Sequence, residues 1–129
     1  MKDLDNKNCY GYEGLIDSFE VDVVLSEHDD DYQGDSFYLL RDADNRYGYL
    51  VFGWGSCSGC DAFEAASDDV SWGSNPTALI DLRDELWNDV SWFDSLDNLR
   101  AYFVENDVKL QWYGYRSTFK VFLERVNGL

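Results

Sequence analysis

The spacing of apolar residues changes partway along this chain, and that change limits the folds open to it. Between residues 19 and 54, apolar side chains alternate with polar ones or form short apolar runs, which is typical of β-strands. From residue 76 onward they recur every three or four residues, which is typical of amphipathic helices. Strands followed by helices indicate an α+β fold, and 129 residues suit one domain spanning 1–129.

Three strands are expected in the first part of the chain. A strand with alternating apolar residues begins at Phe19, a second covers the apolar run 37–40, and a third covers 47–54. The third is apolar on both faces and is therefore expected to be central in the sheet. The connecting turns are short, which favours an antiparallel meander. Residues 109–113 can add a short fourth strand.

Helices are expected in the second half of the chain. The longest is predicted over residues 76–93, with Asn75 as its N-cap and an apolar stripe on one face. Another begins after Asp94 or Ser95, and a last one covers residues 117–127. The predicted fold class is therefore α+β, a three- to four-stranded antiparallel sheet packed against C-terminal helices.

The composition excludes disorder and limits the binding partners. The chain has 26 Asp and Glu against 10 Lys and Arg, a formal net charge of 10 − 26 = −16. Acidic disordered tails lack apolar residues, whereas 17% of this chain is aromatic, so we expect a folded protein. Direct binding to nucleic acid or to anionic membranes is disfavoured, because both depend on cations.

No segment of the sequence predicts export or membrane insertion. The first residues have no apolar core of signal-peptide length, and no window approaches the roughly 18 apolar residues of a membrane span. We therefore expect a soluble, cytoplasmic protein.

The charge is unevenly distributed along the sequence. Residues 1–108 hold 25 acids and 6 bases, a net charge of 6 − 25 = −19, whereas residues 109–129 hold 1 acid and 4 bases, a net charge of 4 − 1 = +3. The basic segment can dock on the acidic body of its own chain or of a second copy, so a homo-oligomer is one expectation.

Two acidic clusters are candidate partner-binding surfaces. One lies opposite the leucine stripe of the longest predicted helix and consists of Asp81, Asp84, Glu85 and Asp89. Neighbouring side chains on a helix face are about 5–6 Å apart, so this row can present a pattern that resembles nucleic-acid phosphates. The other lies in the first predicted turn and consists of Asp29, Asp30, Asp31 and Asp35. An ordinary solvated surface is the alternative interpretation of each cluster.

The acidic turn also has part of a calcium-loop pattern. Asp29, Asp31 and Asp35 are spaced as in the first half of an EF-hand loop, but Leu40 stands where the bidentate glutamate belongs. An acidic hairpin turn is the simpler interpretation.

The cysteines leave several interpretations open. Three cysteines do not suit a secreted disulfide framework and are typical of free thiols in a reducing compartment. Cys57 and Cys60 lie between a predicted strand and a short helix expected over residues 61–66, the arrangement of thioredoxin-like redox sites. The adjacent Asp61 and Glu64 oppose a reactive thiolate. The simplest interpretation is that the cysteines are small buried fillers of a glycine-rich turn.

A structural zinc site is a further alternative, because zinc needs four ligands. The only set available by count is Cys9, His28, Cys57 and Cys60. One CxxC is half of a zinc signature, and the other two ligands lack paired spacing. We therefore assign no cofactor.

No pattern in the sequence indicates catalysis. The chain has no nucleophile elbow, Walker loop, HExxH or GxGxxG motif, and His28 is its only histidine. We expect a protein that is not an enzyme.

Two stretches resemble a family of small uncharacterised bacteriophage proteins. Residues 31–38 (DYQGDSFY) match a DYxGxxxY turn, and residues 49–63 hold an aromatic strand followed by GSCSGCDA, with Phe63 where that family has leucine. The resemblance implies a phage origin and no activity. In charge and size the chain is also similar to phage anti-defence proteins that mimic DNA, including anti-restriction and anti-CRISPR proteins.

These expectations combine into one hypothesis. The chain is a non-enzymatic, phage-type inhibitor that occupies the basic nucleic-acid-binding groove of a host defence protein, with Trp87 or Trp92 as an aromatic anchor. The alternative is a small zinc-supported structural or regulatory module that uses the CxxC motif.

Overall fold

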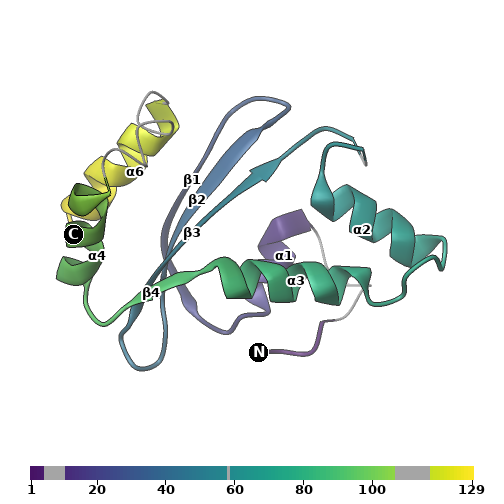
Figure 1. Cartoon of the computed structure of the whole chain (residues 1–129), viewed down its shortest axis with the longest axis horizontal. Helices are drawn as coiled ribbons and strands as arrows, with labels where there is room; N and C mark the ends of the chain where they lie inside the picture. Colours follow the sequence, from purple (N-terminus) through teal and green to yellow (C-terminus); the bar gives the residue numbers. More distant parts are fainter. Residues whose placement is uncertain (5–10, 58, 107–116) are drawn as a thin grey trace.

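A four-stranded antiparallel sheet runs through the middle of the molecule, with helices on both of its faces (Figure 1). The computed structural model describes residues 1–4, 11–57, 59–106 and 117–129. The strands follow one another across the sheet in chain order, so the predicted α+β fold with an antiparallel meander is confirmed. The elements are α1 (Gly11–Asp17), β1 (Asp22–His28), β2 (Gly34–Arg41), β3 (Tyr47–Trp54), α2 (Ala62–Ser71), α3 (Ala78–Asp89), β4 (Ser91–Phe93), α4 (Leu96–Glu105) and α6 (Ser117–Asn127).

Strand β2 is buried on both of its faces. Five consecutive residues from Ser36 to Leu40 are buried. Successive side chains of a strand point to opposite faces. Phe37 and Leu39 therefore pack with one set of helices, while Tyr38 and Leu40 pack with the other. The sheet thus separates two hydrophobic cores.

The first core lies between the sheet and helices α1 and α3. Leu15 and Ile16 of α1 pack with Leu82 and Leu86 of α3, and Leu50 of β3 is buried in the same cluster. Full burial of one such side chain contributes about 1.5–3 kcal/mol relative to exposure. This core holds α3 in place, and α2 packs beside α3 (Figure 1).

The second core is rich in aromatic rings and lies between the sheet and helices α4 and α6. The rings of Phe37 and Phe119 have centroids 5.2 Å apart, and Tyr49 meets Phe103 edge to face at 5.0 Å. Phe122 of α6 is fully buried among them. The C-terminal helices therefore pack on the sheet as predicted, although helices cover the opposite face as well.

The helix predicted over residues 76–93 is wrong at its C-terminal end. Helix α3 ends at Asp89, and Ser91–Phe93 form β4, which pairs with the beginning of β3. A helical wheel places Val90 and Phe93 on one stripe, but Val90 packs in the first core and Phe93 in the second. Strand β4 thus carries the chain from one face of the sheet to the other.

Other boundaries also differ from the prediction. Helix α3 begins after Thr77, and Asn75 accepts hydrogen bonds from the main-chain N–H and the hydroxyl of Thr77 at 3.1 and 3.0 Å instead of capping the helix. The first strand begins at Asp22 because Phe19 belongs to the turn after α1, a helix that the pattern did not predict. The strand predicted over residues 109–113 lies outside the described residues.

Two predicted helix starts are confirmed, and a third helix is longer than expected. Ser95 caps α4, since its hydroxyl accepts a hydrogen bond from the Asn98 N–H at 3.1 Å. The last helix covers Ser117–Asn127 as predicted. The short helix expected after the CxxC motif is α2, which extends to Ser71.

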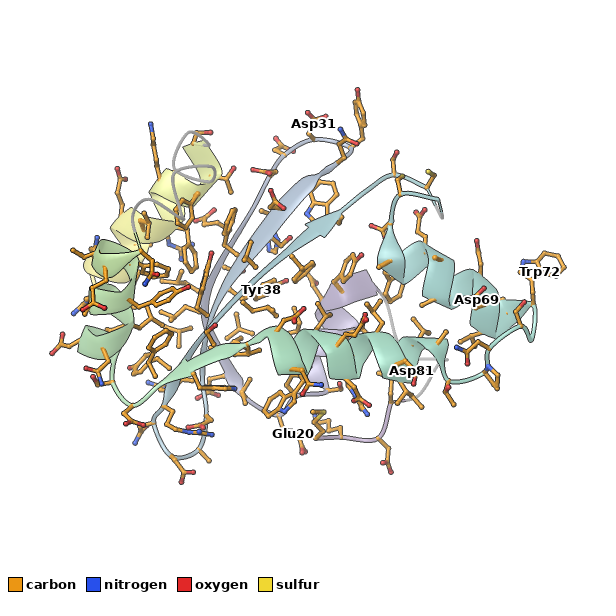
Figure 2. All side chains as sticks on the ribbon, in the orientation of Figure 1. Glu20, Asp31, Tyr38, Asp69, Trp72 and Asp81 are labelled. Atoms are coloured by element: carbon orange, nitrogen blue, oxygen red, sulfur yellow. The ribbon has the colours of Figure 1, made fainter. Side chains whose placement is uncertain are left out.

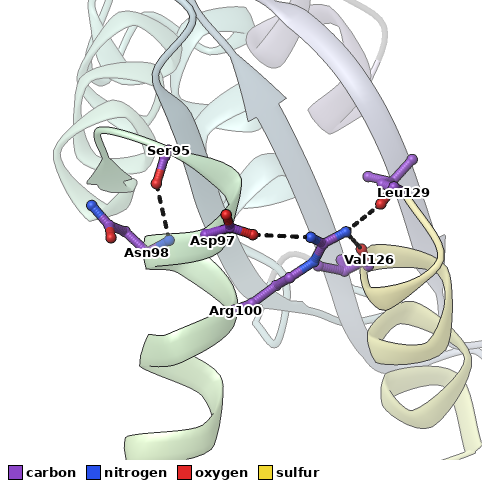
Figure 3. Close-up of polar contacts among 6 residues, drawn as sticks. All are labelled: Ser95, Asp97, Asn98, Arg100, Val126 and Leu129. Carbon is purple, nitrogen blue, oxygen red and sulfur yellow. Dashed lines mark hydrogen bonds and ion pairs between the residues drawn. The ribbon is translucent and has the colours of Figure 1, made fainter.

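Arg100 of α4 fastens the C-terminal helix to its neighbour (Figure 3). Its guanidinium donates to the main-chain oxygen of Val126 at 3.1 Å and to that of Leu129, and it pairs with Asp97 at 3.3 Å. The last carbonyls of a helix have no partner within the helix and favour a nearby cation. Arg100 therefore supplies donors that the end of α6 needs.

We expect Arg100→Met to lower the free energy of unfolding by about 1–3 kcal/mol, because two main-chain oxygens lose a charged donor. Urea denaturation followed by tryptophan fluorescence measures the change. The control is Asp97→Asn, whose side chain is 91% exposed and whose removal should leave the denaturation midpoint unchanged. Equal effects of the two substitutions would contradict this role of the main-chain contacts.

Candidate functional site

The four acids predicted on the long helix lie on the exposed face of α3. Asp81, Asp84, Glu85 and Asp89 are all exposed. On the opposite face, Leu79, Leu82 and Leu86 are buried. The helical periodicity therefore predicted this face correctly, even though it placed the end of the helix too late.

Helix α2 adds carboxylates that the sequence reasoning did not include. Glu64, Asp68 and Asp69 are exposed on α2. Asp69, together with Asp81 and Glu85 of α3, borders a groove of about 250 Å³ that contains Ala62, Ala65, Ala66 and Ala78. We call this feature the acidic groove. Figure 2 shows Asp69 and Asp81 on their two neighbouring helices.

The segment that builds the acidic groove has almost no compensating positive charge. Residues 61–90 contain 8 acids and 1 base, a net charge of 1 − 8 = −7. The base, Arg83, donates to the main-chain oxygen of Lys2 at 2.8 Å and to Asp84 at 3.2 Å. Its charge is therefore held between α3 and the first residues of the chain.

Among the tryptophans that the structure describes, the one that is largely exposed is not one of those predicted as anchors. Trp87 and Trp92 are partly buried against the first core, with ring centroids 5.7 Å apart. Trp72, at the C-terminal end of α2, is 84% exposed. It projects from the turn between α2 and α3, beyond Asp69 (Figure 2). Trp72 is therefore more accessible to a second molecule than either tryptophan named from the sequence.

The acidic turn between β1 and β2 is partly structural. The Asp29 carboxylate accepts a hydrogen bond from the Asp35 N–H at 2.8 Å, and the Asp29 N–H donates to the Asp35 main-chain oxygen at 3.0 Å. A Cβ at Gly34 would lie 2.5 Å from the Asp29 Cβ, so this turn requires glycine there. Asp30 and Asp31 are the exposed acids of the cluster.

The two acidic clusters do not form one surface. Asp31 lies at the tip of the β1–β2 hairpin, whereas Asp81 lies on α3, well apart from it in Figure 2. The sequence placed both clusters correctly on turn and helix, but it carried no information on the distance between them.

Of the proposed zinc ligands that the structure describes, Cys57 and Cys60 lie together, but no third ligand joins them. His28 places Nδ1 2.7 Å from the Ser36 hydroxyl. Within residues 1–4, 11–57, 59–106 and 117–129, no three His, Cys, Asp or Glu side chains are grouped to hold a metal ion. The acids of the calcium-like turn, Asp29, Asp31 and Asp35, are among these residues. Cys9 lies outside the described residues.

The expectation that the cysteines of the CxxC motif are buried fillers is wrong. Cys57 and Cys60 are both exposed, in the turn between β3 and α2. The tightly packed residue of this turn is Gly55, because a Cβ at that position would lie 2.5 Å from the Cys60 main-chain oxygen. Glycine shapes the turn, and the thiols face outward.

Asp61 is the buried carboxylate that fixes this turn to the rest of the fold. It is 6% exposed and accepts hydrogen bonds from the Gly55 N–H at 2.8 Å, the Glu64 N–H at 3.0 Å and the Tyr12 hydroxyl at 3.1 Å. Burial raises the pKa of Tyr12 to about 12, so this donor keeps its proton at neutral pH. Asp61 thus joins α1, the end of β3 and the start of α2.

A second hollow lies between α1 and the sheet. It has a volume of about 320 Å³, and its lining includes Tyr12, Glu13, His28, Tyr38 and Trp54. Burial, followed by the nearby carboxylates of Glu13 and Asp17, raises the pKa of Tyr38 to about 12. The lining is largely aromatic with one carboxylate, that of Glu13, and the sequence did not indicate this hollow because α1 was not predicted.

Comparisons of the chain with known proteins found no match. No family model, no curated protein and no solved structure matches the chain. In the part of the chain that the structure describes, none of the helices has the length and apolar character needed to cross a membrane.

Replacing the buried carboxylate should destabilise the protein. We expect Asp61→Ala to lower the free energy of unfolding by about 1–3 kcal/mol, because it removes the N-cap of α2 and leaves buried donors without an acceptor. Urea denaturation followed by circular dichroism measures the loss. The control is Glu64→Gln, an exposed acid in the same turn of helix, which should change stability little. Equal stability of the two variants would show that Asp61 has no such role.

Proposed function

We propose that this protein is a non-enzymatic, phage-type inhibitor that binds the basic nucleic-acid-binding groove of a host defence protein by DNA mimicry. The observation that supports the proposal is the acidic groove, which gathers carboxylates from two helices where the sequence pattern indicated one row. The host target would be an RNA-guided or restriction nuclease, and the site of action the host cytoplasm.

Charge favours a basic protein partner over every anionic one. A net charge of −16 repels nucleic acid and anionic lipid, while it attracts a groove lined with lysine and arginine. Complementary fields of this kind speed association and make binding sensitive to salt. The segment with a net charge of −7 that builds the acidic groove concentrates this effect on one side of the molecule.

The acidic groove also offers more than charge. Its alanine floor lets the stem of an arginine or lysine side chain lie between Asp69 and Glu85. Trp72 next to it can bury a large ring area, and tryptophan is among the residues that dominate binding energy at interfaces. The hairpin acids Asp30 and Asp31 supply a second, separate contact.

The test compares variants that change the same number of charges in different places. Asp69→Asn, Asp81→Asn and Glu85→Gln are combined in one groove variant. Asp44→Asn, Asp97→Asn and Glu105→Gln are combined in a control variant, whose three acids are also exposed but lie elsewhere. Each variant is expressed in bacteria that carry a restriction or RNA-guided nuclease, and phage plating efficiency is measured. Displacement of labelled duplex DNA from the purified nuclease gives the affinity.

We expect the wild-type protein to restore phage plating and to compete with DNA for the nuclease. The groove variant should lose about tenfold or more in affinity, because three charges leave the contact surface, while the control should lose much less. If both variants weaken binding equally, net charge and not the acidic groove is responsible. If the wild-type protein protects against none of the nucleases and displaces no DNA, the proposed function is wrong.

A further inference from the structure

The turn between β3 and α2 brings two thiols into contact. The Sγ atoms of Cys57 and Cys60 are 2.6 Å apart, and both side chains are exposed. A disulfide bond has a length of about 2.0 Å, so joining these atoms requires a movement well below one ångström. The turn itself is held by hydrogen bonds from the Cys60 and Asp61 N–H groups to the Cys57 main-chain oxygen, at 3.0 and 2.8 Å.

The two thiols are not equivalent. The Cys57 N–H donates to the Cys60 Sγ at 3.0 Å. The contact between the two thiols lowers the pKa of Cys60 and raises the pKa of Cys57. When it is protonated, the Cys60 thiol donates to the Cys57 main-chain oxygen at 3.2 Å. Asp61, which the sequence suggested would oppose a thiolate, directs its carboxylate to three donors elsewhere. Cys60 is therefore suited to attack, and Cys57 to resolve.

Cys60 also faces space in which a second molecule can react. It lines a hollow of about 490 Å³ together with Gln33, Gly34, Asp35, Gly53 and Trp54. The hollow lies between the turn and the adjoining ends of β2 and β3. An attacking thiolate needs an open approach along the axis of the disulfide that it cleaves.

We propose that Cys57 and Cys60 form a dithiol–disulfide couple that exchanges with low-molecular-weight disulfides. The Cys60 thiolate attacks one sulfur of the disulfide RSSR, forming a mixed disulfide and releasing one thiolate, which takes up a proton. The Cys57 thiol then loses its proton and attacks the Cys60 sulfur, releasing the second RSH. The protein loses two hydrogens and RSSR becomes two RSH. The proposal does not depend on the function proposed above.

The test uses the reduced full chain and the neutral probe 2-hydroxyethyl disulfide. After an acid quench, the intact mass should show the loss of two hydrogen atoms, and peptide mapping should place the bond between Cys57 and Cys60. Cys57→Ser should stop at a mixed disulfide on Cys60, because it lacks the resolving thiol. Cys60→Ser should react at Cys57 at least about threefold more slowly than Cys57→Ser reacts at Cys60.

Three outcomes would overturn the proposal. One is a stable mixed disulfide on the wild-type chain, which would show that Cys57 does not resolve it. Another is a bond to Cys9 in place of the expected pair. The third is one tightly bound zinc ion per purified chain, released only when the thiols react, because zinc-bound thiols would serve structure instead of exchange. Circular dichroism of both serine variants confirms that they remain folded.

Discussion

The burial of β2 on both faces is the constraint on which the rest of this structure depends. A half-buried sheet needs helices on one side only. Here Phe37 and Leu39 require one apolar layer, and Tyr38 and Leu40 require another. The chain must therefore supply helices to both faces, and it must cross the sheet at an edge to do so. The edge strand β4 makes that crossing between α3 and α4.

Two cores in a chain of this size explain where the charge must lie. In the part of the chain that the structure describes, most leucines and aromatic rings cover the sheet, and most acids lie at exposed positions on helices, turns and strand ends. Asp61 is an exception, since it is buried and its carboxylate accepts three hydrogen bonds. A buried carboxylate is tolerated only with such partners. The exposed acids of α2 and α3 have no such requirement, and they are the acids proposed above to contact another molecule.

Sequence periodicity predicted the parts of the fold in which the spacing of apolar residues fits either a strand or a helix, but not both. The three long strands and the last two helices follow from it, as does the exposed acidic face of α3. The prediction failed at Val90 and Phe93. Residues three positions apart lie on the same face of a helix, but they also lie on opposite faces of a strand, and here they pack in different cores. Helix α1 was missed because only Leu15 and Ile16 are buried in its seven residues.

The candidate site was predictable in its charges but not in its assembly. The acids on α3 were found by their spacing, and Glu64, Asp68 and Asp69 have comparable spacing on α2. Their proximity depends on how α2 packs beside α3, which is a tertiary property. The exposure of Cys57 and Cys60 was likewise not predictable, because it depends on a turn in which Gly55 lets the main chain of Cys60 approach closely.

The acidic groove raises an energetic question, because two helices with like charges lie side by side. Like-charge pairs on a helix cost a few tenths of a kcal/mol each at moderate ionic strength. Each buried leucine of α3 contributes about 1.5–3 kcal/mol, and Leu79, Leu82 and Leu86 are all buried. Burial therefore exceeds repulsion, and α3 stays on the sheet. The repulsion that remains is weakened by any cation near the groove, dissolved salt included, so the binding of a basic partner proposed above should depend on ionic strength.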